Sequence, residues 1–284
     1  MTLKINYLDK KNIRHKNTAI FVSANSKKEA FERKFDERLN NKIINLVTKN
    51  KNIKKDKIFS LNKDFDERIV IIFIAQSKSE LEFEKFGASF FDYLKNSEIY
   101  EINIEISKNI NSQMFSSFIH GLELKSYEFN FYKTNKTNKN INIYVNKKDL
   151  QIKIKKLDAI LSGVNFTRDL VSEPGNVLHP DEYAKRLLKL KKIGLKVTVY
   201  NEKQLKKMGC NALLGVGQGS IRGSYLVTME WNGKKSKSKP LAFVGKGVCF
   251  DTGGISLKPA KFMEDMTYDM AGSAVVAGLM KNFA

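Results

Sequence analysis

Cysteine, histidine and long apolar runs are scarce in this sequence, and each shortage excludes a class of protein. The two cysteines, Cys210 and Cys249, lie far apart and outside any CxxC spacing, which argues against a disulfide framework and a structural zinc site. No apolar run approaches the roughly 18 residues of a membrane span, and the N-terminus lacks the apolar core of a signal peptide. We therefore expect a soluble cytoplasmic protein.

The same shortages narrow the kinds of catalysis available to the chain. The three histidines, His15, His120 and His179, share no ligand spacing, no GxSxG motif occurs, and neither cysteine has a neighbouring histidine. The stretch GVGQGS at 215–220 lacks the third glycine of a dinucleotide-binding fingerprint and predicts a turn. Any chemistry must therefore come from lysines, carboxylates or the backbone.

Acidic residues are outnumbered: 30 Asp and Glu face 50 Lys and Arg, for a formal net charge of +20. A charge of this sign can mark a surface for nucleic acid or for an anionic membrane. However, Lys, Asn and Ile crowd the whole chain, as in NKKDL and KTNKTNKN. Because a uniform bias raises the isoelectric point without building a site, we interpret the charge as compositional and expect no membrane partner.

Strand-like and helix-like patterns alternate through the first half of the chain, which predicts an α/β domain over residues 1–150. With 284 residues the chain has room for two domains of about 100–200 residues each. Runs of β-branched residues predict strands at 19–22, 69–75, 100–106 and 141–145. Apolar residues at helical spacing predict helices at 27–48 and 78–94.

The pattern changes near residue 151. Apolar residues recur every three or four positions and predict a connector helix over 151–172, which ends before Pro174 and Gly175. Residues 173–284 form a second α/β segment. Its predicted helices are 179–192, 202–208 and 272–283, and its predicted strands are 195–200, 225–231 and 241–244.

The stretch VGKGVCFDTGGISLKP at 244–259 places two lysines and one aspartate among four glycines. If the run before it is a strand, Lys246 lies at the carboxyl end of that strand, where open α/β sheets build their sites. Asp251 follows in a glycine-rich turn, Lys258 comes seven residues later, and Asp269 directly precedes the last predicted helix. The spacing therefore predicts that four charged groups converge.

Two interpretations of these four groups stay open on spacing alone. Hard divalent metals take carboxylate oxygens readily, and a buried lysine can join them as the neutral amine, so the four groups could form a cation site. Alternatively, the two lysines pair with the two aspartates as two salt bridges, which occur in proteins without any function.

The stretch at 244–259, followed by MEDMTYDMAGSAVV, resembles the metal-binding core of the cytosolic leucine aminopeptidase family, a family of dinuclear metallopeptidases. The resemblance extends upstream through NFTRDLVSEPGNVLHP and MGCNALLGVGQGS to IHGLELKSYEF, and so covers most of residues 115–284. It implies that residues 173–284 are the N-terminal portion of an α/β catalytic domain with a mixed central sheet. The first hundred or so residues carry no family motif.

The resemblance also implies a role for each polar residue. Lys246 and Asp269 would bind the more labile metal, and Asp251 would bridge both metals. Lys258 would stabilise the developing oxyanion, and Met266 would form a wall of the pocket for the substrate's first side chain. The implied cofactors are two divalent ions, Mn²⁺ or Zn²⁺, and the implied reaction is hydrolysis of N-terminal residues from peptides. The full-length family further implies a homo-hexamer.

One family motif does not occur in the sequence: the Asn-Thr-Asp-Ala-Glu-Gly-Arg segment that supplies further metal ligands and an arginine. We therefore expect a C-terminally truncated family member that has half a metal site and is inactive alone. Two alternatives stay open. The charge of +20 would suit a nucleic-acid-binding or regulatory protein. An incomplete sheet with unpaired edges would suit a non-functional remnant.

Overall fold

The structure is a computed structural model, and the chain divides into two compact units, Met1–Leu157 and Asp158–Ala284. Among the described residues, no helix is both long enough and apolar enough to cross a membrane. The domain boundaries expected at residues 150 and 172 stay predictions. The described residues are 2–8, 16–23, 35–50, 52, 56–64, 66–74, 79–105, 111–135, 140–146, 154–234 and 239–284.

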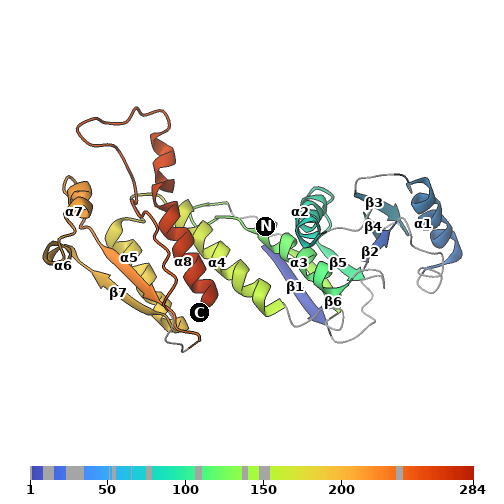
Figure 1. Ribbon diagram of the computed structural model, residues 1–284. Helices are drawn as coiled ribbons and strands as arrows, with labels where there is room; N and C mark the ends of the chain where they lie inside the picture. Colours follow the sequence, from blue (N-terminus) through green and yellow to red (C-terminus); the bar gives the residue numbers. More distant parts are fainter. Residues whose placement is uncertain are drawn as a thin grey trace. The chain divides into compact units, whose positions relative to one another are not determined.

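A six-stranded mixed sheet forms the centre of the first unit (Figure 1). Neighbouring strands are parallel, except that the edge strand β3 runs antiparallel to β4. The predicted α/β class is confirmed, and β2, β4, β5 and β6 match the four strands predicted in this half, except that residues 75 and 106 lie outside the described residues. The strand order is β1 (Thr2–Leu8), β6 (Asn140–Asn146), β5 (Glu101–Glu105), β2 (Asn17–Ser23), β4 (Arg68–Ile74) and β3 (Lys57–Asn62).

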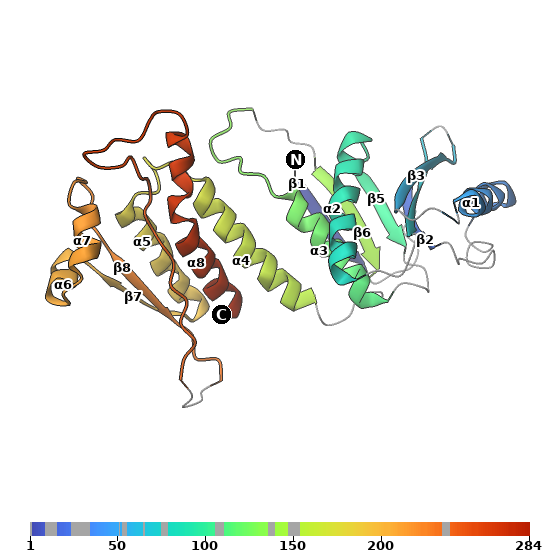
Figure 2. The ribbon, with the colours of Figure 1, turned by 45° about the horizontal axis from the view of Figure 1, so that its top comes forward.

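Helices cover both faces of this sheet. Successive side chains of its buried central strands point to opposite sides, so each face presents apolar residues that a helix can bury. Phe21 of β2 belongs to the apolar cluster shared with α2 (Glu80–Asn96) and α3 (Ser112–Ser126). Its neighbour Ile20 belongs to the cluster shared with α1 (Glu37–Lys49). Figure 2 shows α2 and α3 running along one another. The helices predicted at 27–48 and 78–94 are confirmed as α1 and α2, which begin later than predicted, at Glu37 and Glu80. Residues 27–34 and 78 lie outside the described residues.

Over its described residues the second unit is mainly helical, and its strands β7 and β8 form an antiparallel pair. The predicted helices and the first two predicted strands are confirmed, except that residues 151–153 of the connector helix lie outside the described residues. Residues 215–217 of the predicted turn belong to the end of a helix. The elements are α4 (Ile154–Ser172), α5 (Pro180–Leu188), η3 (Lys189–Ile193), β7 (Lys196–Tyr200), α6 (Glu202–Lys207), α7 (Asn211–Gly217), β8 (Leu226–Glu230), η4 (Met263–Met270) and α8 (Ala271–Phe283), where η marks a 3₁₀-helix.

Helices α4 and α8 lie side by side in this unit (Figures 1 and 2). The Thr167 hydroxyl of α4 donates a hydrogen bond to the Ala274 carbonyl of α8 at 3.1 Å. Small residues allow this approach, since a Cβ on Gly278 would lie 2.5 Å from the carbonyl oxygen of Gly163. The packing fixes α8, whose first turn follows the predicted site residue Asp269.

The strand predicted at 241–244 is wrong. These residues form no ladder with any described strand, and Leu241 and Val244 are 80% and 97% exposed. A strand exists only where a neighbouring backbone accepts and donates its hydrogen bonds. Within the described residues of this unit, β7 and β8 pair only with each other. Lys246 therefore lies in a loop and not at the end of a sheet strand.

Candidate metal centre

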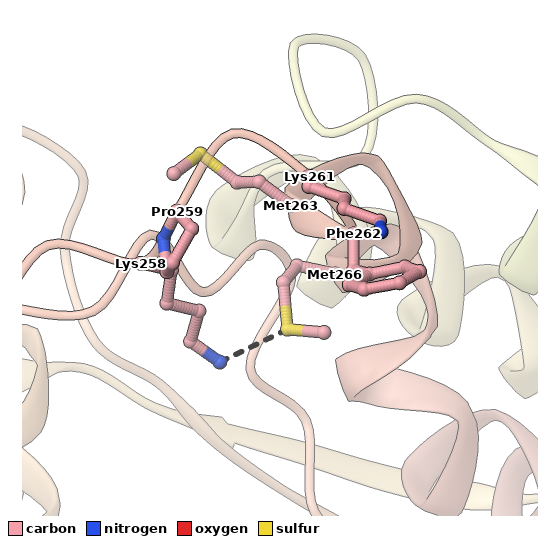
Figure 3. Close-up of a pocket in the computed structure, with 6 residues that line it drawn as sticks. All are labelled: Lys258, Pro259, Lys261, Phe262, Met263 and Met266. Atoms are coloured by element: carbon pink, nitrogen blue, oxygen red, sulfur yellow. Dashed lines mark hydrogen bonds between the residues drawn. The ribbon is translucent and has the colours of Figure 1, made fainter.

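The predicted site residues come together in two ion pairs. Lys246 Nζ lies 2.5 Å from Asp269 Oδ1, and Lys258 Nζ lies 3.0 Å from Asp251 Oδ2. Lys258 Nζ also contacts Met266 Sδ at 3.0 Å (Figure 3). This geometry is the one that the salt-bridge interpretation of the sequence describes. The metal-binding roles of these residues stay predictions.

The first turn of α8 holds the backbone of Lys246 next to η4, the 3₁₀-helix that carries Asp269. The backbone N–H of Ser273 donates to the Lys246 carbonyl oxygen at 2.9 Å. A Cβ on Gly245 would lie 2.5 Å from Ser273 Cα, so only a glycine permits this approach. Packing between a loop and a helix start therefore brings together two side chains that are 23 residues apart.

A tight loop brings Lys258 to Asp251. Gly253 has a φ of +92°, a left-handed conformation that glycine adopts without strain, and its N–H donates to Asp251 Oδ1 at 2.9 Å. The N–H of Lys258 donates to the Thr252 carbonyl at 3.0 Å and closes the loop. The glycines of the predicted turn thus orient the carboxylate, while the loop returns the lysine to it.

The electrostatics of the two aspartates differ. The pKa of Asp251 is lowered, chiefly by the hydrogen bond from the Gly253 N–H and then by Lys258, with a smaller contribution from Lys246. Asp269 is less exposed, and its Oδ2 is buried with no hydrogen-bond partner among the described residues. Asp251 is thus ionised and already paired, whereas Asp269 presents an unused acceptor oxygen.

These donors fit a hard divalent metal in kind but not in number. Carboxylate oxygens are the ligands such ions prefer, and the unpartnered Oδ2 of Asp269 is one of them. Across the described residues, no group of three or more His, Cys, Asp and Glu side chains is arranged to hold a metal. The chain therefore offers two carboxylates and the amine of Lys246. These three groups make up only part of the coordination shell of such an ion.

A cavity of about 400 Å³ opens beside Lys258. Figure 3 shows its side chains, with the Lys258 amine directed at the Met266 sulfur. Thioethers and an aromatic ring make its wall apolar and adaptable. Such a wall beside the Lys258 amine suits an apolar side chain whose attached carbonyl lies near that amine. The cavity is lined by Lys258, Pro259, Lys261, Phe262, Met263 and Met266.

Phe262 forms part of this lining in a strained conformation. Its φ of +72° lies in the left-handed region, which costs a bulky residue about 1–3 kcal/mol. Strain of this kind persists only where the surroundings impose it, and it concentrates at binding sites. Sequence reasoning identified Lys258 and Met266 but not Phe262 or Met263. The sequence signal that could have found Phe262 is its position immediately before MEDM, a segment of the family resemblance.

The two histidines that the structure describes take no part in this cluster. His179 is the N-cap of α5, where its Nδ1 lies 3.4 Å from the Glu182 backbone nitrogen and 2.5 Å from Asp181 Oδ1. His120 is buried in α3 of the first unit. His15 lies outside the described residues. That the histidines are structural or lie on the surface, and are not catalytic, stays a prediction.

Comparisons with known proteins point to the same family as the sequence motifs. Residues 165–284 match the family described as "Cytosol aminopeptidase family, catalytic domain". A "Probable cytosol aminopeptidase" of Brucella ovis is 42% identical over 230 residues, which are 77% of this chain and 46% of the relative. One of Phytoplasma australiense is 50% identical over 182 residues, 62% of this chain and 37% of the relative. The chain thus spans about half the length, or less, of these curated relatives.

Two solved structures share the fold. A mutant of tomato leucine aminopeptidase matches with a TM-score of 0.73 and 19% identity, over 99% of this chain and 59% of the other. The bottromycin maturation enzyme BotP in complex with Mn matches with a TM-score of 0.70 and 20% identity, over 94% of this chain and 55% of the other. At these identities the likeness establishes the fold alone.

Proposed function

We propose that this chain, whose residues 165–284 belong to the catalytic domain of the cytosol aminopeptidase family, provides one side of a two-metal centre that hydrolyses N-terminal residues from peptides. The family is one of hydrolases. The observation that carries the proposal is the buried Oδ2 of Asp269, which has no hydrogen-bond partner among the described residues, in a cluster that borders an apolar cavity. Ion pairs alone would not require the cavity or the buried, unpartnered carboxylate oxygen.

Three residues of the chain would hold the divalent ions, Mn²⁺ or Zn²⁺. Asp251 and Asp269 would contribute carboxylate oxygens, and Lys246 would contribute its neutral amine. The buried Oδ2 of Asp269 supports this assignment because it is an acceptor without a hydrogen-bond partner among the described residues. When bound, such ions polarise a scissile carbonyl and activate water at neutral pH.

Lys258 would act on the substrate directly. Its ammonium has three N–H donors, one of which faces Asp251 and another the Met266 sulfur. A thioether is a weak acceptor, so the donor at Met266 can turn to a substrate carbonyl oxygen at little cost. There it would stabilise the negative charge that develops in the transition state. Asp251, 3.0 Å from the amine, would keep the lysine directed at this position.

Met266 would sort substrates by their first side chain. Its thioether lies between the Lys258 amine and the rest of the cavity, so a side chain in the cavity would place its own carbonyl near that amine. The flexible methionines and the Phe262 ring favour apolar residues of different shapes. We infer that the substrates are peptides with an apolar N-terminal residue.

The remaining metal ligands would come from further polypeptide. The matched part is 46% of the Brucella ovis relative and 37% of the Phytoplasma australiense relative. The exposed backbone at 241–244 could pair with a strand of that polypeptide, which would cover Leu241 and Val244. We therefore infer that the 284-residue chain is inactive alone. The free thiols of Cys210 and Cys249 and the names of the relatives support a cytoplasmic location.

Complementation tests this function. The chain is loaded with Mn²⁺ and assayed with leucine p-nitroanilide, alone and together with the C-terminal part of the Phytoplasma australiense relative as a separate polypeptide. We expect turnover only in the mixture. Lys258→Ala should abolish it, whereas Lys207→Ala, at the exposed end of α6, should not. Turnover by the chain alone that depends on Lys258 would overturn the inference of inactivity. No turnover in the mixture would count against a peptidase role.

A further inference from the structure

Ser273 connects the two chain segments that carry Lys246 and Asp269. Its backbone N–H donates to the Lys246 carbonyl oxygen at 2.9 Å. Its hydroxyl donates to the carbonyl oxygen of Met270, the residue after Asp269, at 2.8 Å. One residue at the start of α8 therefore bonds to the backbone on both sides of the Lys246–Asp269 ion pair.

Tyr183 of α5 reaches this connection from 90 residues away in the chain. Its hydroxyl lies 3.0 Å from the Ser273 hydroxyl oxygen, and the residue is 5% exposed. Because Ser273 uses its hydrogen for Met270, Tyr183 is the donor of this bond. Burial raises the pKa of Tyr183 to about 12, so the phenol retains its proton at neutral pH. The hydrogen bonds thus run from Tyr183 through Ser273 to Met270.

Close packing leaves Ser273 little freedom. A Cβ on Gly245 would lie 2.5 Å from Ser273 Cα, and one on Gly247 would lie 3.1 Å from the Ser273 hydroxyl oxygen. Met270, which accepts from Ser273, is fully buried. The glycines on either side of Lys246 therefore rest directly on Ser273, and a displacement of Ser273 would displace Lys246 relative to Asp269.

We propose that Ser273 and Tyr183 are positioning residues of the candidate metal centre. The Tyr183 hydroxyl fixes Ser273, and Ser273 sets the backbone separation at which the Lys246 amine and the Asp269 carboxylate meet. This inference rests on the proposed function for its effect on metal binding. Residues that orient metal ligands without touching the metal typically contribute a factor of about 10–100 to metal affinity.

The test compares four variants of the full chain: Tyr183→Phe, Ser273→Ala, their double variant, and Thr167→Val. The last is the matched control, because Thr167 also bonds to a carbonyl of α8, that of Ala274, but not to the segment of Lys246. Mn²⁺ is titrated into each protein, and the free ion is followed by electron paramagnetic resonance. Hydrogen exchange at the amides of 245–247 and 271–274 is followed by mass spectrometry without metal, after thermal unfolding shows that each variant is folded.

We expect the Mn²⁺ dissociation constant to rise about tenfold in Tyr183→Phe and in Ser273→Ala. The double variant should match Ser273→Ala, since Tyr183 acts through Ser273, and Thr167→Val should match the wild type. Exchange at both segments should be faster in the first three variants only. Unchanged affinity and exchange in Tyr183→Phe would overturn the proposal, as would equal losses in Thr167→Val. Additive losses in the double variant would overturn the claim that Tyr183 acts through Ser273.

The exchange measurement separates this inference from the proposed function. If the wild-type chain binds no Mn²⁺, the metal-binding function fails. The positioning of Lys246 by Ser273 and Tyr183 is then still decided without metal. Faster exchange in Tyr183→Phe than in Thr167→Val would retain it, and equal exchange in the two variants would overturn it.

Discussion

Lys246 and Asp269 are 23 residues apart in the chain, and their Nζ and Oδ1 atoms lie 2.5 Å apart. The carboxylate is the less accessible partner, with 17% of the Asp269 side chain exposed against 60% for Lys246. Its Oδ2 is buried without a hydrogen-bond partner among the described residues. An unsatisfied buried acceptor costs free energy. The ion pair alone therefore does not explain the arrangement, whereas a divalent cation bound by Asp269 would supply the partner.

The loop between Asp251 and Lys258 should depend on Gly253 and not on its neighbour Gly254. Gly253→Ala places a side chain on a residue with a φ of +92°, with its Cβ 2.4 Å from the Ser256 carbonyl oxygen. We expect it to lower the free energy of unfolding by about 1–3 kcal/mol, as measured by urea denaturation. Gly254→Ala is the control, because its Cβ would meet no heavy atom of the described residues within 4 Å. Equal losses from both substitutions would contradict the role assigned to Gly253.

The Asp251 carboxylate should make stability depend on pH in the acid range. Its pKa is lowered in the folded protein, first by the Gly253 N–H and then by Lys258. The ionised form therefore stabilises the fold above the ordinary pKa of about 3.9, and this contribution is lost as the pH falls through the lowered pKa. We expect Asp251→Asn to melt below the wild type at pH 6 and the gap to narrow at pH 3. A gap that is constant with pH would show that this carboxylate does not carry the effect.

Two glycine-to-alanine substitutions in helices of the second unit should have opposite effects. A Cβ on Gly278 of α8 would lie 2.1 Å from the Thr167 hydroxyl and 2.5 Å from the Gly163 carbonyl, so α4 and α8 would have to separate. We expect Gly278→Ala to cost about 1–3 kcal/mol. Gly215→Ala in α7 meets open space and should stabilise the helix by roughly 0.5–1 kcal/mol. Thermal unfolding of both variants checks the signs, and a neutral Gly278→Ala would contradict the close packing.

The two thiols should react at different rates. Cys249 is buried, and burial raises the pKa of its thiol to about 12, whereas Cys210 is half-buried before α7. Only the thiolate is a nucleophile. An aromatic disulfide reagent at pH 8 should therefore label Cys210 quickly and Cys249 slowly. Cys210→Ser should remove the fast phase, and denaturation should make the wild-type thiols equivalent. Two equally fast thiols in the native protein would contradict the burial of Cys249.

Local sequence patterns predict those helices and strands whose signals lie within the element itself. Strand β4 has an uninterrupted run of β-branched residues, and α2 has apolar residues at helical spacing behind a Ser79 cap. Helix α3 was missed although its signal is present: Asn111 caps it, and Phe115, Phe118, Ile119 and Leu122 are its buried residues. The edge strand β3 has little signal of its own, since it depends on pairing with β4.

The features that local patterns do not predict depend on contacts between residues far apart in the chain. The run at 241–244 has the composition of a strand, but a strand requires a partner that the described residues of this unit do not supply. Motif spacing predicts that Lys246, Asp251, Lys258 and Asp269 lie close together. It does not predict which lysine meets which aspartate, because the turn at Gly253 and the packing of α8 decide the pairing. No local pattern connects Tyr183 to Ser273.

The central claim is that the two aspartates bind a metal and do not only pair with lysines. Its most direct test is a Mn²⁺ titration of the full chain and of Asp251→Asn, Asp269→Asn and Asp265→Asn. Asp265 is the matched control, because it is exposed on the same 3₁₀-helix as Asp269. We predict saturable binding that weakens by about tenfold or more in Asp251→Asn and Asp269→Asn and is unchanged in Asp265→Asn. Equal affinity in all four proteins, or no saturable binding to the wild type, would contradict the account and leave two salt bridges in its place.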